Sequence, residues 1–281
     1  MNDSIIYYFS GTGNSLHVAR ELKHRLPGTE IVPILSVLKE GITVQGAEQV
    51  GLVFPIYVSA IPKPVRAFLD LINLTSTQYL YAVTTNGGFP GKVDYLVYRL
   101  LESKGFKLDY YSSLKMISNT ATGLMPAFMI NKKWADLIHA DKVAKMELEL
   151  QNELEFVAKS LKNKEKNIGP ECIPPLVRKV LLSITEKMSP LEKANAVNFF
   201  VDHDCNGCGI CEKVCPSEKI KLVNGKPEWP EKTQCYYCYA CFNFCPQQAI
   251  LVKGYEYKTG RYKHPNVNVA DIARQKDYYT G

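Results

Sequence analysis

The chain has 281 residues, of which 46 % are apolar and 22 % are charged, a balance typical of a folded protein with room for two domains rather than of a disordered chain. Lysine and arginine outnumber aspartate and glutamate by 34 to 28, and the formal net charge of +6 suggests nucleic-acid binding as one hypothesis. No apolar run approaches the ~20 residues that span a bilayer, so we expect no transmembrane helix.

The first element predicted along the chain is a strand, followed by a polar loop and a helix. Ile5 to Phe9 is an apolar run of strand length, and Leu16 to Leu26 carries apolar residues at helical spacing. The loop between them brings unpaired backbone N–H groups and the positive end of the helix dipole to one point, which predicts a phosphate site. A plain turn is the alternative. The loop residues are Ser10, Gly11, Thr12, Gly13, Asn14 and Ser15.

This loop resembles the phosphate loop of flavodoxins, Ser/Thr-x-Thr-Gly-Asn-Ser/Thr, at all six positions. It lacks the lysine of a nucleoside-triphosphate loop, and Leu16 stands where a dinucleotide fingerprint has a small residue. The resemblance implies a flavodoxin-like fold with flavin mononucleotide (FMN) as its cofactor.

Two further strand, loop and helix units follow. Strands are predicted at Val50 to Phe54 and Tyr79 to Thr84, with helices at about 63–72 and 92–104, and Tyr110 to Ile117 is predicted to close the sheet. The alternation predicts an α/β fold with a doubly wound parallel sheet and a ligand beyond the carboxyl ends of its strands.

By resemblance to flavodoxins, the loops after the strands at Val50 to Phe54 and Tyr79 to Thr84 hold the isoalloxazine ring. Tyr57 and Phe89 are the aromatic candidates for stacking on the ring, the alternative being that they only cover the sheet. The residues implied are Pro55, Ile56, Tyr57, Thr85, Asn86, Gly87, Gly88 and Phe89.

The middle of the chain has helical patterns without strand signals. Asp136 to Lys162 and Leu176 to Lys187 are predicted amphipathic helices. The segment Ser118 to Ile130 is either a lid beside the flavin, with Asn119, Thr120, Thr122, Met125 and Phe128 as its candidate residues, or a simple connection.

Eight of the nine cysteines form two copies of one spacing, C-x2-C-x2-C-x3-C-P, which begin 30 residues apart at Cys205 and Cys235. The spacing resembles the ligand run of bacterial two-cluster ferredoxins, in which the last cysteine of each run ligates the other cluster. The resemblance implies two 4Fe-4S clusters. Cluster one would be held by Cys205, Cys208, Cys211 and Cys245, and cluster two by Cys235, Cys238, Cys241 and Cys215.

Two other uses of the cysteines fit less well. Disulfides need an oxidising compartment, and the chain opens without a secretory pattern. Structural zinc does not explain the third cysteine of each run or the proline.

Short strands at 220–223 and 250–252 are predicted to shield the clusters from water. Cys172 lies outside both runs and receives no function, and His203 and His264 are treated as structural.

Both resemblances together identify the chain as similar to fusions of a flavodoxin-like domain with a bacterial-type two-cluster ferredoxin domain. We predict a flavodoxin-like FMN-binding domain at 1–118, a helical linker or lid at 119–196, a small α+β ferredoxin domain at 197–254 and a tail at 255–281 that packs on the core. Two clusters at about −2 each and a flavin phosphate at about −1.5 to −2 offset most of the basic charge, so we expect no nucleic-acid partner.

The resemblance implies electron transfer between a redox protein partner, such as a ferredoxin or an oxidoreductase, the two clusters and FMN. The alternatives are an FMN-dependent oxidoreductase that acts on a small-molecule acceptor, and a redox or iron sensor. No acid–base constellation identifies catalytic residues. We expect the protein to be cytoplasmic and to come from an anaerobe, because such clusters need reducing conditions.

Overall fold

The computed structural model describes residues 3–41, 47–57, 59–72, 74, 78–88, 90–119, 138–167, 197–253, 255 and 258–277. Its amino-terminal part contains a five-stranded sheet in the order β2-β1-β3-β4-β5, in which every neighbouring pair is parallel. The strands are β1 (Ser4–Tyr8), β2 (Thr29–Pro33), β3 (Gln49–Pro55), β4 (Tyr79–Asn86) and β5 (Tyr110–Lys115). This order is that of the flavodoxin-like doubly wound fold, as predicted.

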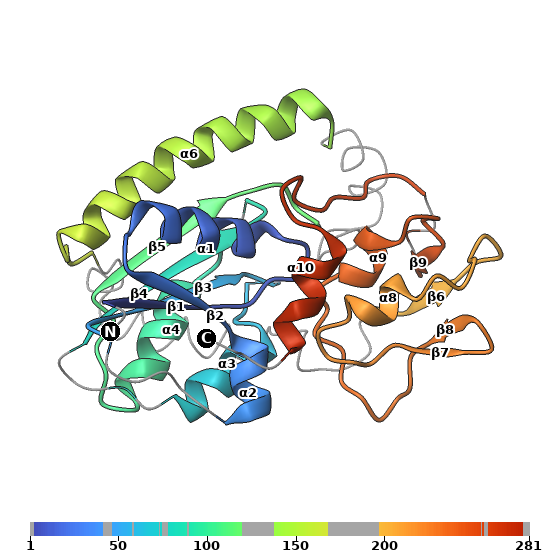
Figure 1. The fold of residues 1–281 in the computed structure, drawn as a ribbon, viewed down its shortest axis with the longest axis horizontal. Helices are drawn as coiled ribbons and strands as arrows, with labels where there is room; N and C mark the ends of the chain where they lie inside the picture. Colours follow the sequence, from blue (N-terminus) through green and yellow to red (C-terminus); the bar gives the residue numbers. More distant parts are fainter. Residues whose placement is uncertain are drawn as a thin grey trace.

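Helices cover the sheet and explain its composition (Figure 1). Every residue of β1 and β4 is buried, as expected for central strands with a helical layer on each face. The helices that connect the strands are α1 (Asn14–Arg25), α2 (Ile34–Glu40), α3 (Lys63–Leu71) and α4 (Val93–Glu102). The predicted helices near 63–72 and 92–104 are therefore confirmed, the second with a shorter span. The sequence patterns above predicted neither β2 nor α2.

The long helix α6 (Ala140–Lys162) packs against α1 and β5. Its buried residues Leu150, Leu154, Val157 and Leu161 recur at helical spacing, which confirms the predicted amphipathic helix. The helix begins later than predicted, because the side chain of His139 caps it by accepting from the backbone N–H of Lys142. The second predicted helix, at 176–187, lies outside the described residues.

The cysteine-rich part is built from two similar halves. Helix α8 (Ile210–Lys213) lies in the first cysteine run and α9 (Ala240–Phe244) in the second, and the two helices are in contact. Strand β7 (Lys221–Val223) pairs with β8 (Lys226–Glu228), and β9 (Ile250–Val252) pairs with β6 (Phe199–Val201), both antiparallel. The predicted short strands are confirmed in position, and Ile220 and Ile250 are buried beside the cysteines.

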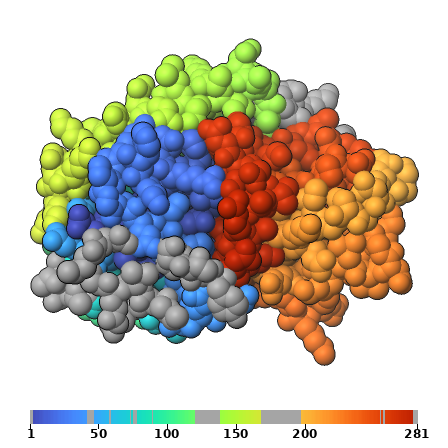
Figure 2. All heavy atoms as spheres, in the orientation of Figure 1, coloured from blue at the N-terminus to red at the C-terminus, as the bar shows by residue number. Residues whose placement is uncertain are grey.

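The carboxy-terminal segment connects both parts of the molecule (Figure 2). The guanidinium group of Arg261 donates to the carbonyl oxygens of Gln248 (2.7 Å) and Ile250 (2.8 Å) in the cysteine-rich part. Only a few residues later, the backbone N–H of His264 donates to the carbonyl oxygen of Thr12 (2.9 Å). Helix α10 (Val269–Ala273) and a 3-10 turn at Arg274–Lys276 then pack against α8 and α2. Among the described residues, no helix has the length and apolar composition needed to cross a membrane.

Candidate redox site

A cavity that is open to solvent, with about 400 Å³ of empty space in and above it, lies at the carboxyl ends of β1, β3 and β4. Its walls come from the three loops that the sequence predicted to converge there, together with the chain that follows β5. The lining residues are Ser10, Gly11, Thr12, Asn14, Ser15, Pro55, Ile56, Tyr57, Thr85, Asn86, Gly87, Ile117, Ser118 and Asn119.

Gly13 and Gly88 shape the loops without lining the cavity. Gly13 has φ of 105°, a left-handed conformation that favours glycine, and it caps α1. A Cβ at this position would lie 2.8 Å from Val267 and 2.9 Å from His264, so the tail also requires a glycine here. The N–H of Gly88 donates to Asn86 Oδ1 (2.7 Å) and holds the turn after β4. Phe89 lies outside the described residues.

Hydrogen bonds hold the loop at 10–15 in place. The N–H of Gly13 donates to Ser10 Oγ (3.1 Å), and the hydroxyls of Ser15 and Thr85 lie 2.8 Å apart, which joins the start of α1 to β4. The Asn14 amide donates to the carbonyl oxygen of Ile117 (3.1 Å), whereas Asn14 Oδ1 is buried without a hydrogen-bond partner among the described residues. A buried acceptor without a donor costs about 1–3 kcal/mol, so this atom favours a bound ligand that donates a hydrogen bond.

The four cysteines predicted for cluster one line a second cavity, open to solvent and with about 320 Å³ of empty space, together with Gly207, Leu222 and Pro227. Cys208 is exposed, whereas Cys211 is buried, and burial raises the pKa of the Cys211 thiol to about 11. The N–H of Ala249 donates to Cys245 Sγ (3.3 Å). N–H donors directed at sulfur are typical of iron–sulfur sites, because they stabilise the negative charge of the cluster.

The four cysteines predicted for cluster two also lie close to one another. Burial raises the pKa of the thiols of Cys235, Cys238 and Cys241, and the nearby sulfur of Cys215 raises each of these pKa values further. All eight cysteines of the two runs are free, and Cys172 lies outside the described residues. Buried thiols that face one another favour metal, since a cluster holds sulfurs as thiolates that burial alone would keep protonated.

Comparison with known proteins agrees with this geometry. Residues 204–250 match the 4Fe-4S dicluster domain family. An uncharacterized ferredoxin of Methanocaldococcus jannaschii is 40% identical over 62 residues, 21% of this chain and 80% of that protein. A ferredoxin of Methanothermococcus thermolithotrophicus is 34% identical over 56 residues, 19% of this chain and 93% of that protein. The chain belongs to the 4Fe-4S ferredoxin family. Since both relatives match about a fifth of the chain, this membership concerns its cysteine-rich domain.

The amino-terminal part is similar to the flavodoxin of Megasphaera elsdenii, with a TM-score of 0.31 and 18% identity over 39% of this chain and 84% of that protein. The score is too low to support the assignment, which depends instead on the parallel strand order β2-β1-β3-β4-β5. The chain is therefore a fusion of a flavodoxin-like domain with a 4Fe-4S ferredoxin domain, as the sequence resemblance predicted. This combination is that of an iron–sulfur electron-transfer protein.

The two domains of this ferredoxin fusion meet where the phosphate-type loop contacts the cysteines predicted for cluster two. A Cβ at Gly11 would lie 2.8 Å from both Cβ and the carbonyl oxygen of Cys238, and 2.5 Å from the hydroxyl oxygen of Tyr57. Burial, and after it the charge of Cys238, raise the pKa of Tyr57 well above its usual value, so the phenol stays protonated. The cavity wall thus borders Cys238 directly.

Sequence patterns missed several residues that hold the loop. The amide of Gln275 is buried, accepts from the N–H of Ser10 and donates to its carbonyl oxygen, both at 2.9 Å. Asn119 was predicted as a lid residue, and its amide donates to the hydroxyl of Thr12. Asn243 donates to the carbonyl oxygen of Asn119 (2.9 Å), which adds a second connection to the ferredoxin domain. The other lid candidates, Thr120, Thr122, Met125 and Phe128, lie outside the described residues.

Proposed function

We propose that the chain is an electron-transfer iron–sulfur flavoprotein that binds FMN in the open cavity at the carboxyl ends of β1, β3 and β4 and two 4Fe-4S clusters on its cysteine runs. The observation that carries the proposal is the contact between Gly11 of the phosphate-type loop and Cys238. A cluster held by Cys238 would adjoin the flavin site. When bound, FMN exchanges electrons singly or in pairs and each cluster exchanges one at a time, so the set connects one-electron and two-electron chemistry.

The residues of the cavity fit FMN in two respects. The loop at 10–15 opens the twelve-residue helix α1, so its backbone N–H groups and the positive helix end suit a phosphate. Asn14 Oδ1, which has no hydrogen-bond partner in the described part of the chain, suits a hydroxyl or N–H donor, and a flavin with its ribityl chain carries both. Tyr57 lies in the wall between the cavity and Cys238, which supports its predicted place beside the ring.

The exposure of the cysteines supports an order for the two clusters. Cys208 of the cluster-one set is exposed, whereas Cys238 and Cys241 of the cluster-two set are buried. We propose that a redox protein partner docks at cluster one and that cluster two lies between that surface and the flavin. A small-molecule reductase remains the alternative prediction, because Phe89 and residues 120–128, expected to line a substrate pocket, lie outside the described residues. We further propose a reducing cytoplasm as the place of action.

The test is anaerobic purification followed by quantitation of iron, sulfide and flavin. About eight irons and one FMN per chain are expected, with bleaching of the flavin band when a reduced ferredoxin is added in substoichiometric amounts. Iron without any flavin binding, after incubation with excess FMN, would refute the flavin assignment. Flavin that reduced ferredoxin cannot reduce, although dithionite can, would refute the proposed connection between the sites.

A further inference from the structure

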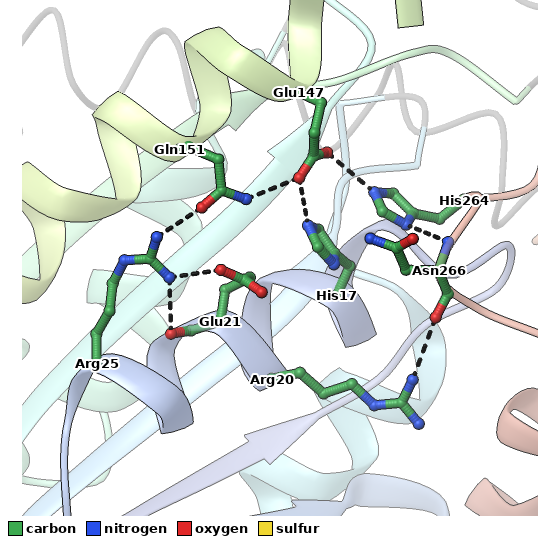
Figure 3. Close-up of polar contacts among 8 residues, drawn as sticks. All are labelled: His17, Arg20, Glu21, Arg25, Glu147, Gln151, His264 and Asn266. Atoms are coloured by element: carbon green, nitrogen blue, oxygen red, sulfur yellow. Dashed lines mark hydrogen bonds and ion pairs between the residues drawn. The ribbon is translucent and has the colours of Figure 1, made fainter. Parts of the chain in front are cut away.

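Two histidines and a glutamate from three separate elements meet behind the phosphate-type loop (Figure 3). His17 Nε2 of α1 lies 2.8 Å from Glu147 Oε1 of α6, and His264 Nε2 of the tail lies 3.3 Å from Glu147 Oε2. The two imidazole rings stack with their centroids 3.9 Å apart. The histidine side chains are 5% and 2% exposed, and that of Glu147 is 32% exposed. We call these three residues the His–Glu–His cluster.

The cluster is bonded to the loop through the backbone. The N–H of His17 donates to the carbonyl oxygen of Gly13 (2.8 Å), and that of His264 donates to the carbonyl oxygen of Thr12 (2.9 Å). His17 follows Gly13 by one helical turn, about 6 Å along the axis of α1. A charge on the cluster therefore acts on an anion in the loop over a short distance.

The hydrogen bonds favour a proton over a metal ion in this cluster. The N–H of Asn266 donates to His264 Nδ1 (3.3 Å), so the neutral ring carries its hydrogen on Nε2 and donates it to Glu147. That nitrogen then has no lone pair for a metal.

The charge states leave one proton acceptor. Burial, and then the neighbouring His17, lower the pKa of His264 to about 4, so this ring is neutral near pH 7. Burial alone would raise the pKa of Glu147, but hydrogen bonds from Gln151 and His17 outweigh burial and lower the pKa, so this group is a carboxylate. A proton added to the cluster is thus held by His17 against Glu147, and it changes the net charge of the cluster from −1 to 0.

The groups around the cluster hold fixed charges in the range where an imidazole titrates. On α1, Arg20 pairs with Asp271 (2.6 Å), and Arg25 pairs with Glu21 (2.5 Å) and with Glu155 of α6 (3.2 Å). Arg274 of the tail also faces Asp271 (3.5 Å). The phenol of Tyr262, whose pKa is raised by burial and by Glu147, stays neutral. These described neighbours therefore keep their charge states around neutral pH.

We propose that the His–Glu–His cluster is a proton-binding site coupled to the phosphate of the bound flavin, so that His17 takes up a proton as the phosphate enters the loop. This inference rests on the proposed FMN binding. A phosphate of charge close to −2 next to a cluster of charge −1 is stabilised when the cluster becomes neutral. Because linkage is reciprocal, protonation strengthens phosphate binding by the same factor.

The expected size is set by the distance and the medium. A divalent anion and a single charge about 10 Å apart, partly screened by water, interact strongly enough to change an affinity by about three- to tenfold. The FMN phosphate has a proton of its own near pH 6, so the affinity of the wild type alone does not isolate the effect. That contribution is common to wild type and variants, and their difference at each pH removes it.

The experiment is calorimetric titration of the full chain, with clusters intact and flavin removed, at pH 6, 7 and 8 in buffers of differing ionisation enthalpy. FMN is compared with riboflavin, which lacks the phosphate. We expect proton uptake with FMN in excess of that with riboflavin, and its loss in His17→Gln and in Glu147→Gln. His24→Gln, an exposed histidine on the same helix, is the matched control and keeps the uptake of the wild type.

Three results would overturn the inference. Equal proton uptake in wild type and both cluster variants, each still binding FMN, would refute the coupling and leave FMN binding intact. Stoichiometric zinc or manganese that is lost in His17→Gln would show that a metal occupies the cluster. Failure of wild type to bind FMN at any pH would refute the proposed function, and this inference with it.

Discussion

Replacing Gly11 with alanine tests the contact between the loop and Cys238. The added Cβ would stand 2.8 Å from the backbone carbonyl oxygen of Cys238 and 2.5 Å from the hydroxyl of Tyr57, whereas ordinary contacts begin near 3.4 Å. The carbonyl must therefore retreat by roughly 0.6 Å, and overpacking of this kind costs about 1–3 kcal/mol. Gly11 does not have a positive φ, so steric overlap alone produces the effect.

The consequence is measurable in two ways. If the strain falls on the flavin-binding form of the loop, FMN affinity drops by about 5- to 150-fold, since 1.4 kcal/mol is a factor of ten. Flavin reduction by reduced clusters, followed by anaerobic stopped-flow absorbance, should also slow, because the ferredoxin domain is displaced from the loop. Both measurements use the full chain with its clusters intact.

Gly105→Ala is the matched control. Gly105 has φ of 81°, and a Cβ at this position would have no atom of the described residues within 4 Å. Alanine there therefore costs backbone strain of about 1 kcal/mol without a steric clash. It should lower stability slightly and leave FMN affinity and flavin reduction unchanged. Wild-type affinity and wild-type reduction rate in Gly11→Ala would refute the contact on which the proposed function depends.

Three further predictions concern other parts of the molecule. Cys208→Ser should lose about four of eight irons while keeping FMN, as measured by iron and flavin analysis, and loss of flavin would contradict the separation of the two sites. Gln275→Leu leaves the N–H and carbonyl of Ser10 unpaired, so thermal unfolding should show about 2–4 kcal/mol less stability; an unchanged Tm would exclude this role. Burial raises the pKa of Asp271, but the hydrogen bond from Arg20 and the other favourable contacts outweigh burial and lower the pKa. The ionised carboxylate therefore stabilises the fold fully above the unfolded pKa near 4, and this stabilisation is lost as pH falls through the lower folded pKa. The stability difference between wild type and Asp271→Asn should stay nearly constant from pH 6 to pH 5 and shrink as pH falls from about 4 to 2, and a difference that stays constant over the lower range would contradict that assignment.

The sequence predicted the elements that carry strong local signals. The strand at β1, its loop and α1 follow from an apolar run, a six-residue pattern and helical spacing, all within about twenty residues. The cysteine runs are equally local, and their fixed spacing led to the two groups of four that the structure brings together. Strand β2 and helix α2 were missed, because β2 is a short edge strand that contains Glu30 and ends in Pro33.

The parts that sequence reasoning could not supply are the contacts between distant segments. Gln275 and Ser10 are 265 residues apart, and an isolated glutamine has no pattern that identifies it as the partner of a loop. His264 was treated as structural for the same reason. Its partners His17 and Glu147 lie 247 and 117 residues away in the sequence, and only folding of α6 and the tail onto α1 brings the three together.

The tail gives a physical reason for placing both redox sites on one chain. Arg261 and Tyr262 bond to the ferredoxin domain, and His264 and Gln275 bond to the loop at Thr12 and Ser10. Because these contacts lie within fifteen residues, a displacement of either domain strains the same short segment. The tail therefore maintains the Gly11–Cys238 contact, which the small size of a glycine permits but cannot itself stabilise. Two separate proteins would have to form this contact anew at each encounter, whereas here it is part of the folded state.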